Sequence, residues 1–442
     1  MALGLSPGSD FTTWMTICAM LLFSFSIWVI FFRFALQSIM QSPKLRSYQF
    51  KQNQEDNNRK EERQRHDERT QRLPVVSVVL PARNEQDNIQ KCLNSLVRQD
   101  YQNYEIIAVD DCSTDATGEI LHKIAASNSD RKITIVDLER KPTGWVGKNW
   151  ACFQGYKRSS GQVLLFTDAD TIHAPNTISL TVRHMVDEKL DALTARPRIT
   201  SDNAWTKIVL PLVWMVSHIA FSASKVNNPK SKTGFVFGGF YLITREVYES
   251  LGTHQSVKGE IAEDLAIGEK LKLGNHRLRM FLGEENIQAS WALDSWSLHS
   301  AIQRTIVSAF RKQPILTCAY AALQAVMLIL PWVVLPYSAY WFFLSSYESE
   351  MLYTNGMLIS ILLILNLLVL GMIFTSSFAL SRLSLRQGSF SVLYVLASPL
   401  ACFFIFSETI LSVIKAATNN DVISWKGRTY QPSKEGLEEQ VL

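Results

Sequence analysis

Four long apolar segments most strongly restrict the structures open to this chain. They cover residues 13–32, 316–346, 351–380 and 390–414, and Glu408 is the single charged residue in them. About 20 apolar residues suffice to cross a bilayer as a helix, which satisfies its own backbone hydrogen bonds where water is absent. The chain is therefore predicted to be an integral membrane protein, with an N-terminal transmembrane anchor (residues 1–37) and C-terminal transmembrane helices (residues 315–416).

The first segment is expected to be retained, because no basic residues precede it as they would in a cleaved signal peptide. A charged linker, residues 38–73, follows and has almost no apolar periodicity. Basic residues collect on the cytoplasmic side of membrane segments, and Arg33, Lys44 and Arg46 stand directly after the first one. We therefore expect the domain that follows to be cytosolic.

The same rule and the number of apolar segments give opposite predictions for the side of the membrane on which the polar tail, residues 417–442, lies. Four complete crossings would return the C-terminus to the outer side, whereas Lys415, Lys426 and Arg428 favour the cytosol. A re-entrant segment would remove the conflict, and residues 316–346 contain Pro331 and Pro336, where a helix could bend back.

The region between the linker and the C-terminal segments, residues 74–314, alternates between strand and helix patterns. Apolar runs at residues 75–80, 104–109, 132–137 and 163–166 predict strands, and amphipathic stretches between them predict helices. This alternation predicts an α/β fold with a doubly wound, mostly parallel sheet. Two further helices, at residues 205–223 and 294–311, have aromatic and basic residues suited to the membrane surface, so we expect interfacial helices. For the first, a helix packed on the sheet is the alternative.

Asp168 and Asp170 follow the apolar run that ends at Thr167. Ligands of open α/β sheets bind at the carboxyl ends of the strands, and Mg²⁺ or Mn²⁺ prefers carboxylate oxygens together with substrate phosphates. The two carboxylates therefore suggest a metal site for a diphosphate. Short matches of this kind are also common in surface loops.

Other predicted strand ends carry groups suited to the same ligand. Pro81, Arg83 and Glu85 lie in the turn after the first strand, and Asp110 and Asp111 end the second, where carboxylates can accept hydrogen bonds from a nucleoside. The loop of residues 144–149 brings Lys148 where a diphosphate could lie. A P-loop is excluded, because Asn149 replaces the Ser or Thr that such a loop requires.

The acidic motifs resemble those of glycosyltransferase family 2. Asp110 and Asp111, then Asp168-Ala169-Asp170, then Ala262-Glu263-Asp264 occur in the order and at the spacing of that family's three signatures, over residues 74–314. Within the family, residues 144–149, 238–240 and 425–430 are similar to membrane-anchored carotenoid- and hopanoid-associated glycosyltransferases that modify lipids. The resemblance implies a GT-A fold and a location in a bacterial inner membrane.

The resemblance also implies a reaction and a role for each residue. A single sugar, expected to be glucose from UDP-glucose, would be transferred with inversion to a hydroxyl of a membrane lipid. Asp170, with Asp168, would hold Mg²⁺ or Mn²⁺, and Asp264 would be the general base, oriented by Glu263. Carboxylates also favour helix N-termini for purely structural reasons, and this is the alternative explanation of the last pair. The remaining donor-site residues are Pro81, Arg83, Glu85, Asp110, Asp111 and Lys148.

Several alternatives concern the acceptor. The lipid could be a hydroxylated carotenoid or other isoprenoid, a diacylglycerol, a sphingolipid or a polyprenyl phosphate. A processive polysaccharide synthase is disfavoured, because Gln303-Arg304-Thr305 departs from the Gln-x-x-Arg-Trp motif typical of such enzymes, although Gln303 and Arg304 stay candidates for binding the acceptor or diphosphate. A membrane scaffold with a degenerate domain is the non-enzymatic alternative. The net charge of +4 is too small to indicate nucleic acid binding.

Overall fold

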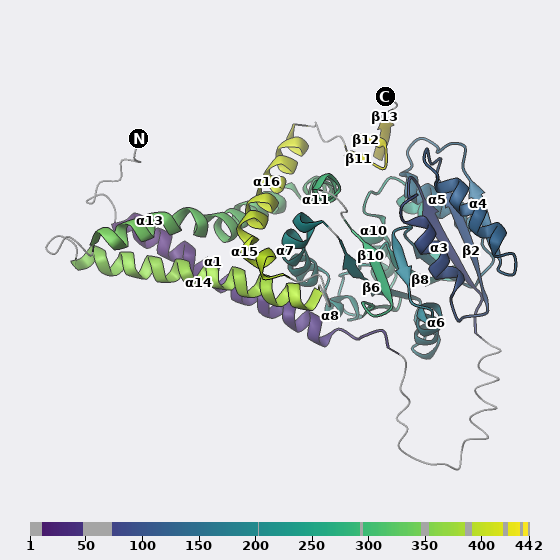
Figure 1. Cartoon of the computed structure of the whole chain (residues 1–442), viewed down its shortest axis with the longest axis horizontal. Helices are drawn as coiled ribbons and strands as arrows, with labels where there is room; N and C mark the ends of the chain where they lie inside the picture. The colour runs from purple at the N-terminus through teal and green to yellow at the C-terminus, as the bar shows by residue number, and fades with distance from the viewer. Residues whose placement is uncertain are drawn as a thin grey trace, which may run out of the picture. The chain divides into compact units, whose positions relative to one another are not determined.

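The computed structural model describes residues 11–46, 73–201, 203–291, 295–345, 353–384, 391–418, 423–433 and 436–440 (Figure 1). The chain divides into two compact units. The helical unit comprises Met1–Met40, Ser201–Ala220 and Ala292–Asp421. The sheet unit comprises Gln41–Thr200, Phe221–Trp291 and Val422–Leu442.

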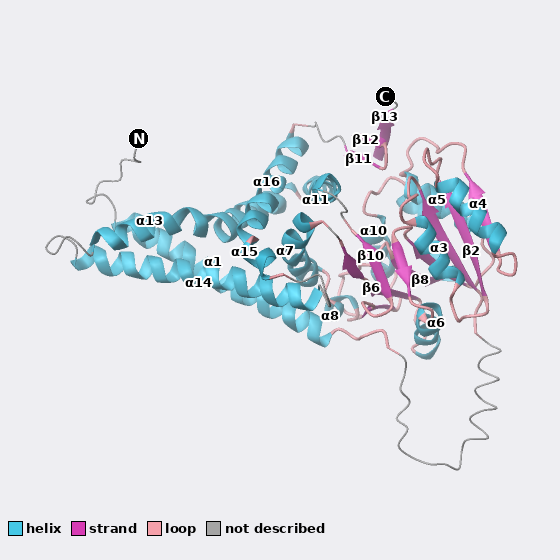
Figure 2. Cartoon of the chain, viewed as in Figure 1, coloured by secondary structure: helices cyan, strands magenta, loops and turns pink. Residues whose placement is uncertain are grey.

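A seven-stranded sheet forms the centre of the sheet unit, in the order β3-β2-β1-β4-β8-β6-β9 (Figure 2). Every neighbouring pair is parallel except those of β8, which runs antiparallel to both β4 and β6. The prediction of a mostly parallel sheet is confirmed. The strands are β1 (Val76–Ala82), β2 (Tyr104–Asp110), β3 (Ile133–Asp137), β4 (Val163–Thr167), β6 (Ala192–Arg196), β8 (Phe240–Thr244) and β9 (Leu278–Leu282).

Both faces of this sheet are buried, which explains why its strands are continuously apolar. Val78 and Leu80 of β1 point into one core with α3, α4 and α6, whereas Val79 points into a second core with α5, α9 and α10. The helices are α3 (Ile89–Val97), α4 (Thr117–Ser127), α5 (Gly147–Arg158), α6 (Thr177–Asp187), α8 (Ala223–Val226), α9 (Arg245–Ser250) and α10 (Glu263–Leu273), with the 3₁₀ helix η1 (His254–Val257).

The register of the sheet brings the predicted motifs to one edge. Ala82 at the end of β1 pairs with Asp110 at the end of β2, and β1 also pairs in parallel with β4, which Asp168 follows. The loops after these three strands therefore share the carboxyl edge of the sheet. A smaller sheet stands beside them, formed by β5 (Thr171–His173), β10 (Ile287–Ser290) and β7 (Arg198–Thr200).

The last residues of the chain contain strands of their own. β11 (Ile423–Trp425), β12 (Arg428–Ser433) and β13 (Gly436–Gln440) form a three-stranded antiparallel sheet within the sheet unit. Lys426 and Gly427 connect β11 to β12 with φ angles of 48° and 75°, the left-handed backbone that two-residue hairpin turns require. The sequence predicts only a polar tail here, because it has too few alternating polar and apolar residues to predict strands.

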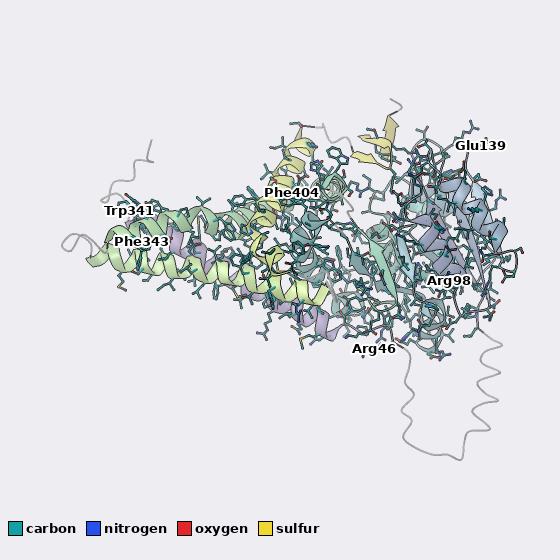
Figure 3. All side chains as sticks on the ribbon, in the orientation of Figure 1. Arg46, Arg98, Glu139, Trp341, Phe343 and Phe404 are labelled. Atoms are coloured by element: carbon teal, nitrogen blue, oxygen red, sulfur yellow. The ribbon has the colours of Figure 1, made fainter. Side chains whose placement is uncertain are left out.

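Among the described residues, five helices are long and apolar enough to cross a membrane, and all but the ends of two of them lie in the helical unit. They span Thr12–Gln41, Ala204–Val226, Pro314–Phe343, Met357–Leu383 and Ser398–Ala417. Large apolar side chains remain exposed on them, as on α13, where Phe343 is 66% exposed (Figure 3). The helices are α1 (Phe11–Gln41), α7 (Ala204–Ala220), α11 (Ser295–Lys312), α12 (Pro314–Gln324), η2 (Ala325–Ile329), α13 (Leu330–Ser345), α14 (Tyr353–Ser384), α15 (Val392–Leu396) and α16 (Ser398–Ala417).

Two of these segments bear on the expectations from the sequence. α7 packs against α14 and α16 and is long and apolar enough to be a candidate span, but strands on both sides of it in the sequence pair in one sheet, so the interfacial helix expected there stays a prediction. The stretch from Pro314 to Phe343 is a continuous helical path and does not bend back at its prolines. A π-helical turn, η2, ends two residues before Pro331, whose missing N–H interrupts the regular hydrogen bonds of the helix.

Candidate active site

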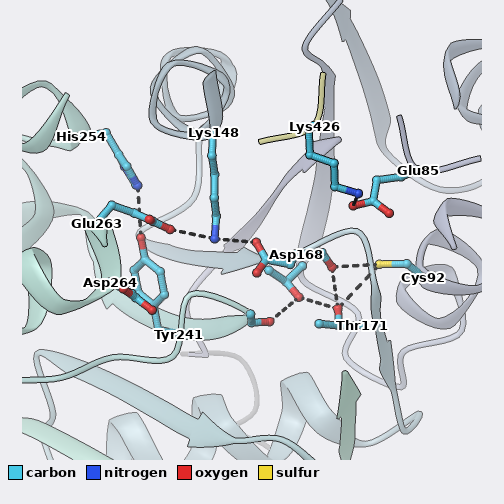
Figure 4. Close-up of polar contacts among 12 residues, drawn as sticks. Glu85, Cys92, Lys148, Asp168, Thr171, Tyr241, His254, Glu263, Asp264 and Lys426 are labelled. Carbon is cyan, nitrogen blue, oxygen red and sulfur yellow. Dashed lines mark hydrogen bonds and ion pairs between the residues drawn. The ribbon is translucent and has the colours of Figure 1, made fainter. Parts of the chain in front are cut away.

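Lys148 links two of the predicted acidic motifs in the sheet unit (Figure 4). Its Nζ lies 2.7 Å from Oδ1 of Asp168 and 2.7 Å from Oε1 of Glu263. The lysine comes from the first turn of α5, Asp168 follows β4, and Glu263 begins α10. Three segments that are far apart in the sequence therefore converge on one ion-paired cluster.

Burial and the neighbouring charges have opposite effects on the pKa of Lys148. Burial favours the neutral amine, but the carboxylates of Asp168 and Glu263 hold the pKa of Lys148 well above its usual value. The ammonium group therefore stays charged at neutral pH. A fixed cation that is 15% exposed, next to a strand end, suits a ligand that carries or develops negative charge.

Asp170 lies on the same loop as Asp168, in a crowded acidic environment. Burial, then the charges of Asp168 and Glu85, raise the pKa of Asp170 to about 8, against the opposite effect of Lys426 and Lys148. Such crowding would be relieved by a divalent cation. The described residues contain no group of three or more His, Cys, Asp or Glu side chains placed to hold a metal. Two carboxylates are nevertheless a sufficient protein contribution for Mg²⁺, which takes its other ligands from phosphates and water.

Asp264 stands one residue after Glu263 and is half-buried. Burial and the neighbouring Glu263 raise the pKa of Asp264 to about 7, with Lys148 opposing the shift. Its Oδ1 accepts a hydrogen bond of 2.8 Å from the N–H of Leu265. A carboxylate with a pKa near the working pH is suited to accept and release a proton.

The turn before β8 approaches this cluster closely and requires glycine. A Cβ atom on Gly238 would lie 2.9 Å from Nζ of Lys148 and 3.3 Å from Oε1 of Glu263. The same atom on Gly239 would meet nothing nearer than 3.5 Å. Gly238 therefore makes room for the ion pair between Lys148 and Glu263.

The loops after β1 and β2 are fastened to each other by Arg83. Its Nη1 donates to the carbonyl oxygens of Asp111 and Cys112, at 2.6 Å each. Asp110 accepts the N–H of Ser113 at 3.0 Å and so stabilises its own turn. Pro81 lies within β1, and Glu85 follows it in the turn. The predicted nucleoside residues are thus adjacent, with Asp110 and Arg83 also holding the loops.

The C-terminal strands bring residues to this edge that we did not predict as site residues. Arg428 forms a bidentate ion pair with Asp111, and Nζ of Lys426 lies 2.8 Å from Oε1 of Glu85. Asn149, considered above only to exclude a P-loop, donates to the carbonyl oxygens of Val257 and Glu260, at 2.8 Å each, and so holds the segment that leads to Glu263. The similarity of residues 425–430 to the family was a signal for the first two.

Gln303 and Arg304 belong to α11 in the helical unit. The amide of Gln303 donates to Oε2 of Glu408 at 3.2 Å and accepts from Nζ of Lys415 at 2.9 Å. These contacts satisfy buried polar groups among apolar helices. A role for Gln303 and Arg304 toward acceptor or diphosphate stays a prediction.

Known proteins similar to this chain point to one family. The model of "Glycosyl transferase family 2" matches residues 77–252. A 4,4'-diaponeurosporenoate glycosyltransferase of Staphylococcus haemolyticus is 24% identical over 59% of this chain, and the match spans 66% of that relative, just under two thirds of its length. Its namesake in Staphylococcus aureus (strain USA300) is 24% identical over 82% of this chain and 89% of the relative.

A solved structure is also similar, the mannosyltransferase PcManGT from Pyrobaculum calidifontis in complex with GDP-Man and Mn2+. It is 17% identical, with a TM-score of 0.49, over 92% of this chain and 98% of that chain. The family match covers β1, β2, β4 and β8, with the loops that contain Lys148, Asp111 and Asp168. The chain therefore contains a domain of glycosyl transferase family 2.

Proposed function

We propose that this chain transfers one glucose from UDP-glucose, with inversion, to a hydroxyl of a membrane lipid. The observation that carries the proposal is the position of Asp264, a half-buried carboxylate with a raised pKa beside the Lys148–Asp168 ion pair. The acceptor is proposed to be a hydroxylated carotenoid or another isoprenoid. The names of the two staphylococcal relatives support this choice.

The proposed reaction is a single displacement. The acceptor hydroxyl gives its proton to the carboxylate of Asp264, and its oxygen forms a bond to the anomeric carbon. The bond from that carbon to the diphosphate breaks, and its electron pair leaves with the nucleoside diphosphate. One displacement inverts the anomeric centre. Lys148, which stays charged, offsets the negative charge that develops on the leaving group, while Glu263 orients the base or the sugar.

A divalent cation, Mg²⁺ or Mn²⁺, would fit beside this cluster. Asp168 and Asp170 would hold it, since their crowded carboxylates favour a cation and their oxygens are the ligands that hard cations prefer. When bound, it would supply further charge compensation for the diphosphate. Asp111 and the turn from Pro81 to Glu85 would hold the nucleoside.

The membrane would supply the acceptor. The five candidate spans support a protein that meets a lipid in the bilayer, and we propose that the sheet unit lies in the cytosol of a bacterium, at its inner membrane. Gln303 and Arg304 of α11 are proposed to contribute to acceptor or diphosphate binding. A donor from the cytosol and an acceptor from the bilayer would then meet at the membrane surface.

The test is sugar transfer by the purified full chain. Radiolabelled UDP-glucose and Mn²⁺ are supplied with separate vesicles that contain a hydroxylated carotenoid, diacylglycerol, ceramide or polyprenyl phosphate, and the labelled lipid is identified. We expect one β-glucosylated isoprenoid. Label in another lipid would reassign the acceptor, label in a long polymer would favour a polysaccharide synthase, and no label from any nucleotide sugar would contradict the proposal.

The glycine turn before β8 provides a matched pair of variants. Gly238→Ala is expected to lower kcat about tenfold or more, because its Cβ would displace Lys148 or Glu263 by several tenths of an ångström. Gly239→Ala is the control, since its Cβ would meet only ordinary contacts. Steady-state kinetics of both variants check this. Equal losses, or a loss only in Gly239→Ala, would contradict the assignment.

A further inference from the structure

The hairpin of β11 and β12, Ile423–Ser433, contacts the loop after β2 through one buried ion pair. Both terminal nitrogens of Arg428 lie against the two carboxylate oxygens of Asp111, with Nη2 3.0 Å from Oδ1. Arg428 is 7% exposed and Asp111 is 3% exposed. A bidentate pair that is removed from water fixes the plane of the carboxylate as well as its position.

The same hairpin also holds the lysine loop. The hydroxyl of Tyr430 accepts the N–H of Gly147 at 3.2 Å, and its ring packs with Val146 and Ile261. A Cβ on Gly147 would clash with Nη1 of Arg428 and Oδ2 of Asp111, so a side chain at this position would have to displace their ion pair. Tyr430 therefore contacts both the segment that begins α5 and the one that leads to Glu263.

The turn of the hairpin, Lys426 and Gly427, contacts the loop after β1. Nε of Arg83 donates to the carbonyl oxygen of Lys426 at 2.9 Å, and Nζ of Lys426 lies 2.8 Å from Oε1 of Glu85 (Figure 4). The charge of Lys426 also acts on Asp170. One hairpin thus touches the ends of β1 and β2 and the start of α5, and adds two cations to an acidic edge.

We propose that this hairpin forms one side of the nucleoside diphosphate site and that Arg428 is a positioning residue, which holds Asp111 in the orientation that binds the nucleoside. The inference rests on the proposed function. A carboxylate offers about four lone-pair positions. Arg428 occupies two of them, so Asp111 can still accept hydrogen bonds from a base N–H or a ribose hydroxyl.

The test measures binding of UDP in the presence of Mn²⁺ to the purified full chain by titration calorimetry. Arg428→Gln is expected to weaken UDP binding about tenfold or more, since loss of a buried charge partner leaves the other charge unpaired, and Arg428→Lys should lie between it and the parent. Arg98→Gln is the control, because Arg98 is exposed at the end of α3 (Figure 3). Inorganic pyrophosphate should bind all four proteins equally.

The pH dependence of UDP binding distinguishes a positioning role of Arg428 from general damage to the site. The guanidinium opposes the effect of burial on the pKa of Asp111, so its removal should raise this pKa further, and UDP binding to Arg428→Gln should recover as the pH rises, more steeply than in the parent. A merely damaged site would not recover. The titratable and charged groups around Asp111 are Arg428, Arg83, Lys141, Cys112, Cys152 and Asp110.

The outcomes are distinct. If the parent binds UDP and Arg428→Gln binds it equally or more tightly, the hairpin is not a positioning element, and tighter binding would mean that it occludes the site. If the parent binds no nucleoside diphosphate, the proposed function fails and this inference fails with it. If Arg428→Gln does not fold, hydrogen exchange of the parent decides: UDP should slow exchange in residues 423–433, and unchanged exchange there would overturn the proposal.

Discussion

Replacing Asp264 by asparagine is expected to lower kcat by about 10²- to 10⁴-fold, the usual contribution of general acid–base catalysis. Asparagine keeps the shape of the side chain and still accepts the N–H of Leu265, but its amide cannot take a proton from the acceptor hydroxyl. UDP binding should be unchanged, because the nucleoside residues lie on other loops. Transfer kinetics and UDP titration of the same preparation check both expectations.

Loss of activity in this variant should not reflect unfolding. The pKa of Asp264 is raised from 3.8 to about 7, so this carboxyl lowers the stability of the fold progressively between these two pH values, and at neutral pH a neutral amide should leave the melting temperature equal or higher. Asp187→Asn, at an exposed position on α6, is the control. Transfer within tenfold of the parent by Asp264→Asn would exclude Asp264 as the base.

The pH profile offers an independent check on the same carboxylate. Asp264 must be ionised to accept a proton, and its pKa is raised to about 7. In the parent, kcat should therefore fall as the pH drops below about 7 and level off above it. A flat profile between about pH 5 and about pH 9 would contradict a base with this pKa.

The fold of the sheet unit was largely predictable, because each strand is a continuous apolar run between turn signals and both sheet faces are buried. β8 begins at Phe240, directly after the glycine turn at Gly238 and Gly239. The helical unit was less predictable. α7 has Lys207 and His218 among its apolar residues, and these suggested an interface, whereas His218 is buried within the unit. Hydropathy alone does not reveal which neighbours bury such groups.

The candidate site could be predicted where it depends on strand ends, and not where it depends on distant segments. Asp168 follows β4 directly, so sheet topology alone places it. The pairing of Arg428 with Asp111 joins residues 317 positions apart, and no local pattern predicts such a contact. The ion pair of Lys148 with Glu263 likewise joins the first turns of two helices, α5 and α10, that are distant in the sequence. Its residues were predicted, but their contact was not.

A second large effect is expected when the ion pairs of Lys148 are removed by substitution. Lys148→Met keeps the length of the side chain but leaves the carboxylates of Asp168 and Glu263 without their shared cation. Breaking a buried pair from one side costs about 3–5 kcal/mol, so we expect a clear loss of stability together with a loss of kcat of about 10²-fold or more. Thermal unfolding and transfer kinetics measure the two effects. Lys123→Met, on the exposed side of α4, is the control.

A double variant separates the two effects of Lys148. Lys148→Met with Glu263→Gln removes one of the two stranded charges and should regain part of the stability, because a neutral amide is less costly to bury than an unpaired carboxylate. Activity should not return, since the cation proposed to face the diphosphate is still missing. Lys148 also lowers the pKa of Asp264, so any residual transfer by Lys148→Met should need a higher pH than the parent. Full activity in the double variant would reduce Lys148 to a purely structural residue, because stability alone would then explain its loss.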